Sequence, residues 1–97
     1  MPASLYDQAI AALEASKASM RCSELTSWLT ALGFDVRDGK RGGHKVFFHD
    51  GLPAFQSSSY NCDHGRNPQI KRPYIVKILR VLREQESDLK KYLEETP

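Results

Sequence analysis

The chain has 97 residues, 40% hydrophobic and 27% charged, and its 14 Lys and Arg outnumber 12 Asp and Glu for a formal net charge of +2 at pH 7. This length and composition are typical of one globular domain with a single core. The apolar runs are too short to span a bilayer, and the N-terminus lacks a basic segment followed by an apolar one, so we expect a cytoplasmic protein without membrane contact.

Two helices are predicted in the first third of the chain. Ser4-Leu5-Tyr6-Asp7 has the form of a capping box, and apolar residues follow at helical spacing, which predicts a helix over residues 5–16. After a polar link over 16–19, Ser23 is expected to cap a second helix. The apolar stripe of this helix consists of Leu25, Trp28, Leu29 and Leu32. Gly33 stands where a glycine often ends a helix.

Three strands are predicted in the middle of the chain. Residues 34–37 alternate apolar and polar side chains, and residues 45–49 are rich in β-branched and aromatic ones. Asp50-Gly51 is a strong hairpin signal. Residues 53–60 are expected to form a third strand at a sheet edge, because Pro53 cannot donate to a ladder.

A polar loop over residues 61–72 is expected to lead into a final helix, in which Pro73 suits the first position. The buried stripe of that helix is expected to consist of Ile75, Ile78, Leu79, Leu82, Leu89 and Leu93. The element order is therefore α-α-β-β-β-α. It predicts an α+β fold in which the helices pack on one face of a three-stranded antiparallel sheet.

The turn Gly42-Gly43-His44, between the first two predicted strands, carries the clearest chemical signal. Residues 37–72 hold seven Lys or Arg against three Asp or Glu, a net of +4, whereas residues 1–36 carry −2 and residues 73–97 balance. The turn thus places an imidazole, which exchanges protons near neutral pH, in the most basic part of the chain. Such a setting suits a phosphate ester better than a carboxylate or an apolar substrate.

Several motifs occur together between residues 20 and 83. They are Met20-Arg21-Cys22-Ser23-Glu24-Leu25, the helix through Leu32-Gly33-Phe34, the Gly42-Gly43-His44 turn before a strand, the loop Asn61-Cys62-Asp63-His64-Gly65-Arg66-Asn67-Pro68 and the closing helix. As an ensemble they resemble the HicA toxins of bacterial HicA–HicB toxin–antitoxin pairs. Residues 1–19 would then be an N-terminal helical extension of a HicA-like domain over residues 20–97.

This resemblance implies a double-stranded-RNA-binding-like α-β-β-β-α fold and the function of a toxin in a type II toxin–antitoxin system. The toxin would be an mRNA interferase, an endoribonuclease that cleaves single-stranded mRNA with one histidine, and a HicB-like antitoxin would neutralise it. An oligomer would form only through the antitoxin complex. Gly42 matches the family's glycine, Gly43 replaces its serine, His44 matches its histidine, and Lys45 stands where a second histidine often lies.

RNA can be cleaved without a metal when one group deprotonates the 2′-hydroxyl, which attacks the adjacent phosphorus, and another protonates the leaving 5′-oxygen. His44 is the expected catalytic residue, as either the base or the acid, with no cofactor. The residues expected to bind RNA phosphates are Lys40, Arg41, Lys45, Lys71 and Arg72. The last two precede a helix N-terminus, which also attracts anions. His64 and Arg66 are expected to extend this surface.

Other interpretations of the same residues remain open. His44 also fits an exposed turn histidine among solvated charges, in a non-catalytic RNA-binding module or in a protein-interaction partner. Phe47 and Phe48 point to opposite faces of their strand, so one faces outward, to stack a base or seat the antitoxin, unless residues 1–19 cover the second face. Lys77 and Arg80 are expected on the solvated face of the last helix.

The cysteines and the two remaining histidines raise the question of zinc. Cys22, His49, Cys62 and His64 lack the paired, short-spaced ligands of structural zinc sites, so no metal is expected. Cys22 and Cys62 are isolated and do not form a disulfide framework, which fits a reducing compartment.

Overall fold

A computed structural model gives the fold of this chain. The residues that it describes are 4–17, 19–63, 65–66 and 68–95. The elements in chain order are α1 (Leu5–Ala15), β1 (Ser19–Arg21), α2 (Cys22–Ala31), β2 (Asp35–Asp38), β3 (His44–Phe48), β4 (Ser58–Asn61), β5 (Gln69–Lys71), α3 (Arg72–Glu84) and α4 (Glu86–Glu95). The predicted α+β class is confirmed.

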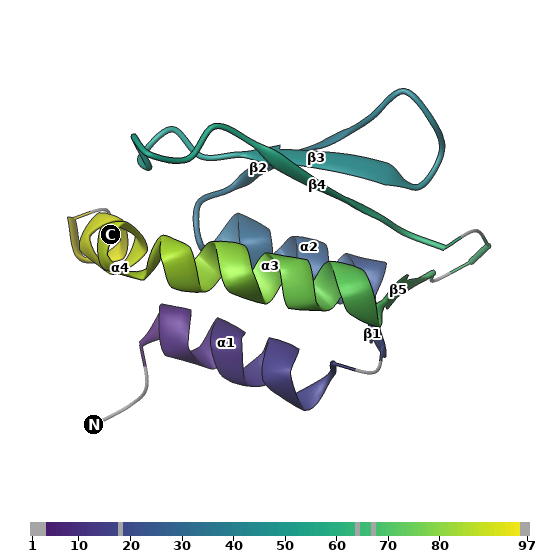
Figure 1. Ribbon diagram of the computed structural model, residues 1–97, viewed down its shortest axis with the longest axis horizontal. Coiled ribbons are helices and arrows are strands. Elements are labelled where there is room, and N and C mark those ends of the chain that lie inside the picture. The colour runs from purple at the N-terminus through teal and green to yellow at the C-terminus, as the bar shows by residue number, and fades with distance from the viewer. Residues whose placement is uncertain (1–3, 18, 64, 67, 96–97) are drawn as a thin grey trace.

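Three layers build the molecule, as Figure 1 shows: a sheet, the helices α2 and α3 beneath it, and α1 beneath those helices. The sheet is antiparallel with strand order β2-β3-β4. The predictions of a three-stranded antiparallel sheet and of helices on one face are therefore confirmed. No described element covers the opposite face of the sheet. The helix α1, which was offered as a possible cover for that face, instead packs against α3 and α4.

A second, two-stranded antiparallel sheet joins β1 to β5, and neither strand was predicted. Residues 16–19 were expected as a link and residues 61–72 as a loop. Both strands have only three residues, too few for the period-two pattern to be recognised. Met20 pairs with Ile70, and both side chains are buried. This ladder fixes the start of α3 beside the start of α2.

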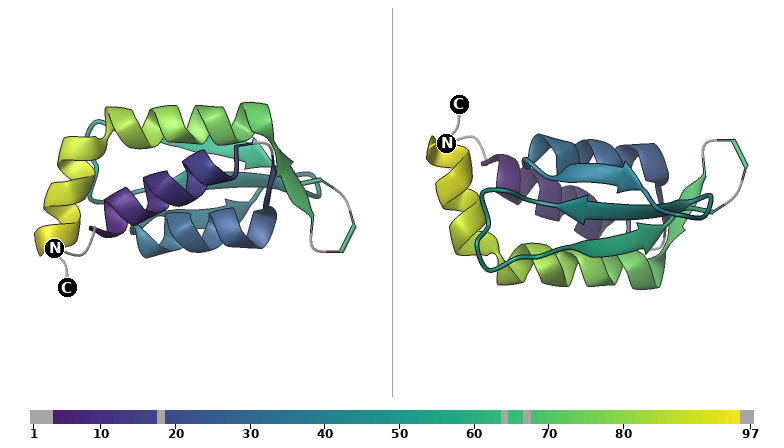
Figure 2. Two further views of the ribbon diagram at one scale, coloured as in Figure 1. Left: turned by 90° about the horizontal axis from the view of Figure 1, so that it is seen from below. Right: turned by 90° about the horizontal axis from the view of Figure 1, so that it is seen from above.

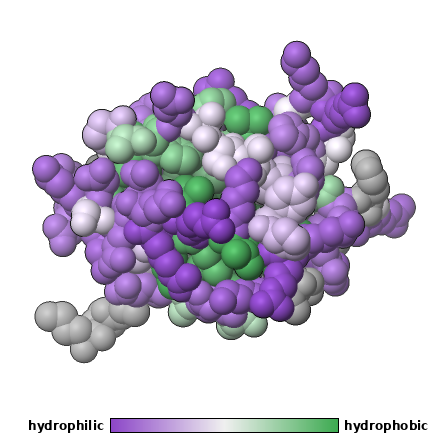
Figure 3. All heavy atoms as spheres, in the orientation of Figure 1, coloured by the Kyte–Doolittle hydropathy of each residue, from purple (hydrophilic) through white to green (hydrophobic). Residues whose placement is uncertain are grey.

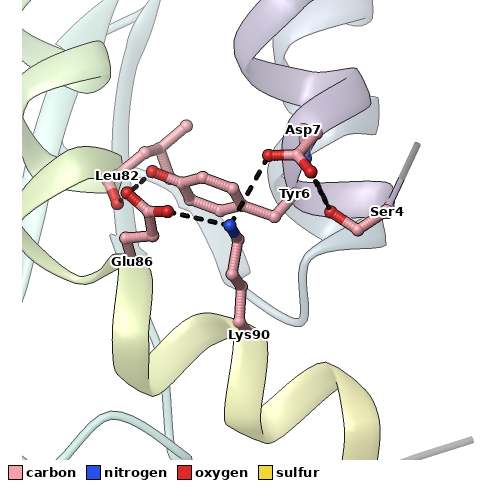
Figure 4. A network of polar contacts seen from close by, with 6 residues as sticks. All are labelled: Ser4, Tyr6, Asp7, Leu82, Glu86 and Lys90. Carbon is pink, nitrogen blue, oxygen red and sulfur yellow. Dashed lines mark hydrogen bonds and ion pairs between the residues drawn. The ribbon is translucent and has the colours of Figure 1, made fainter.

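The first helix begins as the capping box predicts and packs on the last two helices. Ser4 Oγ accepts a hydrogen bond from the Asp7 N–H at 3.1 Å. The buried Tyr6 hydroxyl donates to the Leu82 carbonyl at 3.0 Å. Figure 4 shows Lys90 between the carboxylates of Asp7 and Glu86, at 3.7 Å and 2.8 Å, so both ends of the described chain are joined.

The second helix ends as predicted but begins differently. Gly33 has φ +95°, the left-handed conformation expected of a glycine after a helix. The helix starts at Cys22 rather than after Ser23, and Arg21 occupies the N-cap position without a side-chain cap. The main-chain N–H of Cys22 instead donates to the Pro68 carbonyl at 2.8 Å. A long-range backbone contact has therefore replaced the local serine cap.

The third strand is shorter than predicted, because residues 53–57 remain outside it. Asp50-Gly51 does not join two paired strands directly, since the chain runs through residues 49–57 before β4 begins. The buried side chain of His49 organises this connection. Its Nδ1 accepts from the Gly51 N–H at 3.0 Å, and its Nε2 donates to the Leu32 carbonyl at 2.9 Å.

The final helix is divided in two, at Gln85, instead of running through Leu93. The predicted stripe of Ile75, Ile78, Leu79 and Leu82 is buried in α3. The change of direction, visible in Figure 2, lets Leu89 bury completely.

The two cysteines are joined in a Cys22–Cys62 disulfide, with their Cα atoms 5.7 Å apart. The sequence-based view of two unlinked cysteines is therefore wrong. Spacing along the chain gives no sign of this pair, because the β1–β5 ladder brings the two residues together. No described helix is long and apolar enough to cross a membrane. The cytoplasmic location stays a prediction.

Candidate functional site

A pocket of about 850 Å³ opens where three segments of the chain meet: the turn before β3, the end of β4 and the start of α3. His44, Asn61 and Tyr74 line it, and its charged lining residues are Lys40, Arg41, Lys71 and the acidic Asp63. The pocket therefore contains the predicted catalytic residue and three of the five cations predicted to bind RNA.

The turn holds His44 by its backbone. The Gly39 N–H donates to the His44 carbonyl at 2.8 Å, and the His44 N–H donates to the Arg41 carbonyl at 3.1 Å. A Cβ atom on Gly39 would lie 2.1 Å from Cδ2 of the imidazole, so the ring rests directly on this glycine. Only a residue without a side chain leaves the imidazole in this position.

A chain of hydrogen bonds orients the imidazole. In the β3–β4 register His44 lies opposite Asn61, and its Nδ1 is 2.8 Å from the amide oxygen Oδ1. The amide nitrogen of Asn61 donates to the Tyr74 hydroxyl at 2.8 Å. Because an amide oxygen only accepts hydrogen bonds, Nδ1 must carry a proton. In the neutral ring Nε2 is then the proton acceptor.

The conformation of Gly43 explains why a glycine stands at this position. Its φ is +84°, a region that side-chain-bearing residues rarely adopt. A Cβ atom there would approach the Cys62 carbonyl oxygen to 2.5 Å. The two strands meet closely at this point because the Cys62 N–H donates to the Gly43 carbonyl at 2.7 Å. Glycine is therefore the residue that this backbone requires.

The five predicted phosphate-binding residues do not all face the pocket. Lys40, Arg41 and Lys71 line it and are exposed. Arg72 is the first residue of α3, and its side chain is exposed but does not line the pocket. Lys45 lies on the opposite face of β3 from His44 and forms an ion pair with Asp38.

The bare face of the sheet carries His44, Val46 and Phe48. Phe47 points to the other face and is fully buried, so Phe48 is the phenylalanine that faces outward. The Arg37 guanidinium lies 5.6 Å from the centre of the Phe48 ring, a cation–π contact that covers part of it. This aromatic surface is therefore occupied by a side chain of the protein itself.

Arg66, Lys77 and Arg80 do not line the pocket. Arg66 is exposed and is not part of the lining, and His64 lies outside the described residues. Lys77 is not solely a solvated charge, since it donates to the Ser59 carbonyl at the edge of β4 at 3.0 Å. In the space-filling view of Figure 3, an apolar patch lies between α3 and α1, within a largely hydrophilic surface.

Asn61 and Tyr74, whose side chains form the hydrogen-bond chain to His44, were not predicted as site residues. Asn61 was assigned to a loop, although one more residue of β4 would have placed it opposite the start of β3. Tyr74 sits in the first turn of a helix, beside the buried Ile75. The sequence signal that could have indicated Tyr74 is its closeness to Lys71 and Arg72, two of the cations predicted to bind RNA. Among the described residues, no cluster of three or more His, Cys, Asp or Glu is placed to hold a metal ion.

Comparison of the chain with family models, curated proteins and solved structures finds no match. The class defined by fold and site is therefore a small α+β protein with a cationic pocket around an oriented histidine.

Proposed function

We propose that the chain is an endoribonuclease of the HicA type, an mRNA interferase that cleaves single-stranded mRNA with His44 as its acid/base residue. The observation that carries the proposal is the oriented imidazole of His44 in a pocket with Lys40, Arg41 and Lys71. A neutral ring that presents Nε2 as an acceptor suits removal of a proton from the 2′-hydroxyl.

The element order supports the same family. Within the longer chain, α2, β2, β3, β4 and α3 follow the α-β-β-β-α order that the resemblance implies. In this proposal the fold is double-stranded-RNA-binding-like, and β1, β5, α1 and α4 are additions to it. The histidine stands at the start of the second strand of the three-stranded sheet.

The surrounding charges suit a phosphodiester in its transition state. The phosphorane formed by 2′-oxygen attack carries more negative charge than the ground state, and cations around the pocket stabilise it. The three lining cations also neutralise neighbouring phosphates, so binding should weaken as salt rises. Proton transfer by a side chain needs no metal for this reaction.

The toxin role adds a partner. A HicB-like antitoxin would block activity by covering the pocket and the adjoining bare face of the sheet. That surface presents Arg37 and His44 together with the partly covered Phe48, a mixture of charge and apolar area that suits a protein partner.

The first experiment compares wild type with His44→Ala. RNA integrity is followed in cells that express each form, and cleavage of single-stranded RNA is followed with purified protein in EDTA. We expect wild type to cut in EDTA and the variant to lose roughly 100-fold or more of the rate, the usual contribution of a positioned acid or base.

Three other results would change the assignment. Equal cutting by both forms would remove His44 from catalysis. RNA binding without cutting by either form would make the chain an RNA-binding module. Neither binding nor cutting would favour a protein-interaction partner. His49→Ala is unsuitable as a control because this buried ring makes two backbone hydrogen bonds.

A further inference from the structure

Tyr74 is a second proton-carrying group fixed in the pocket. Its ring is half-buried against the core at the start of α3, which limits its movement. Its hydroxyl oxygen accepts from the Asn61 amide nitrogen at 2.8 Å. The hydroxyl proton is therefore not used in that bond, and no other described residue accepts it. A phenol hydroxyl is both a donor and an acceptor, so this proton is available to a bound molecule.

We propose that Tyr74 is the general acid of the cleavage reaction, an inference that rests on the proposed function. His44 Nε2 takes the proton of the 2′-hydroxyl, the 2′-oxygen forms a bond to phosphorus, and the P–O5′ bond breaks. The departing 5′-oxygen receives the Tyr74 proton. The products are a 2′,3′-cyclic phosphate and a free 5′-hydroxyl, and solvent then takes one proton from His44 and returns one to Tyr74.

The other proton donors in the pocket suit this role less well. Arg41 does not give up its proton in proteins. Lys40 and Lys71 are exposed, and their ammonium groups make no hydrogen bond to a described residue, so no such bond fixes where these groups lie. Tyr74 alone is joined to the base, because one side chain, Asn61, contacts both. The acid and the base are thereby held in a defined relation.

The test uses two RNA oligonucleotides of one sequence, with either a natural 5′-oxygen or a bridging 5′-sulfur at the cleaved bond. Sulfur leaves as a thiolate and does not need a proton. We expect Tyr74→Phe to cut the oxygen substrate roughly 100-fold or more slowly than wild type. With the sulfur substrate the same variant should cut about as fast as wild type.

Three further variants separate the roles. His44→Ala should be slow on both substrates, because base catalysis is needed whatever the leaving group. Asn61→Leu should also be slow on both, because it releases the imidazole from its orientation. Tyr92→Phe removes a phenol hydroxyl from α4, away from the pocket, and should cut both substrates like wild type. Circular dichroism and urea unfolding establish that each variant is folded.

Each contrary result has a distinct meaning. If Tyr74→Phe cuts the oxygen substrate like wild type, or is equally slow on both substrates, Tyr74 is not the acid, and in the second case it only positions Asn61. If His44→Ala alone recovers with the sulfur substrate, histidine is the acid and the inference is wrong. If His44→Ala and wild type cut the oxygen substrate equally, the proposed function fails, and this inference fails with it.

Discussion

Gly42 and Gly43 are neighbours in one turn, but only Gly43 has a backbone conformation and surroundings that exclude a side chain. Gly43 has a positive φ and faces the Cys62 carbonyl, whereas a Cβ atom on Gly42 would meet no atom within 4 Å. A side chain at position 43 is therefore opposed by both the backbone conformation and the opposite strand. At position 42 it extends into open space.

We predict that Gly43→Ser destabilises the chain by about 1–3 kcal/mol. It should also slow RNA cleavage, because the serine would push apart the turn that holds His44 and the strand that holds Asn61. Urea unfolding and the cleavage assay measure the two effects. Gly42→Ser is the matched control and should leave stability nearly unchanged. Equal unfolding midpoints for the two variants would contradict this account.

The disulfide is a connection between elements, since Cys22 begins α2 and Cys62 follows β4. It closes a loop with a sequence separation of 40 residues. It also lies beside the pocket, because Cys62 follows Asn61 directly and its N–H bonds to Gly43. The disulfide therefore anchors the β4 end of the pocket covalently to the start of α2.

We predict that the double variant Cys22→Ser, Cys62→Ser loses roughly 2–4 kcal/mol of stability, the usual contribution of a bond that closes a long loop. Dithiothreitol should lower the urea midpoint of wild type to a similar degree. The same reductant should not affect the double variant, which provides the control. A wild-type midpoint that does not respond to reductant would show that the bond does not stabilise the protein.

Local sequence patterns predicted those features of the helices that depend on residues close together in the chain. Three features depend only on neighbours along one helix: the capping box at Ser4, the glycine Gly33 that follows α2, and the buried stripe from Ile75 to Leu82. The features that were missed depend on distant contacts: the β1–β5 ladder, the start of α2 at Cys22 and the break at Gln85. His44 and three cations could be predicted from composition and resemblance. Asn61 and Tyr74 required the strand register and the position of α3.

Two buried phenols make the stability of the whole molecule sensitive to alkaline pH. Burial raises the pKa of Tyr60, and Asp38 adds to the effect, although the hydrogen bond with Thr26 opposes it. Burial also raises the pKa of Tyr6, with Glu86 acting in the same direction. Both groups therefore hold their protons more tightly in the folded chain than in the unfolded one.

We predict that these two tyrosines contribute fully to the free energy of unfolding below about pH 10, the ordinary pKa of tyrosine. The contribution is lost as pH rises through their higher folded-state pKa values. Urea unfolding at a series of pH values from neutral to strongly alkaline measures the effect. Tyr60→Phe should make the fall shallower, since one of the two groups is removed. A fall equally steep in wild type and variant would assign the pH dependence to other groups.

The pocket is assembled from parts of the chain that are synthesised at different times. The turn with His44 emerges from the ribosome well before Tyr74. Until α3 folds against the edge of β4, Asn61 has no tyrosine to hold its amide, and the imidazole of His44 has no fixed orientation. A nascent chain, or a fragment that ends before α3, thus contains the histidine without the arranged site. Any chemistry of this pocket therefore requires α3 to be folded against the edge of β4.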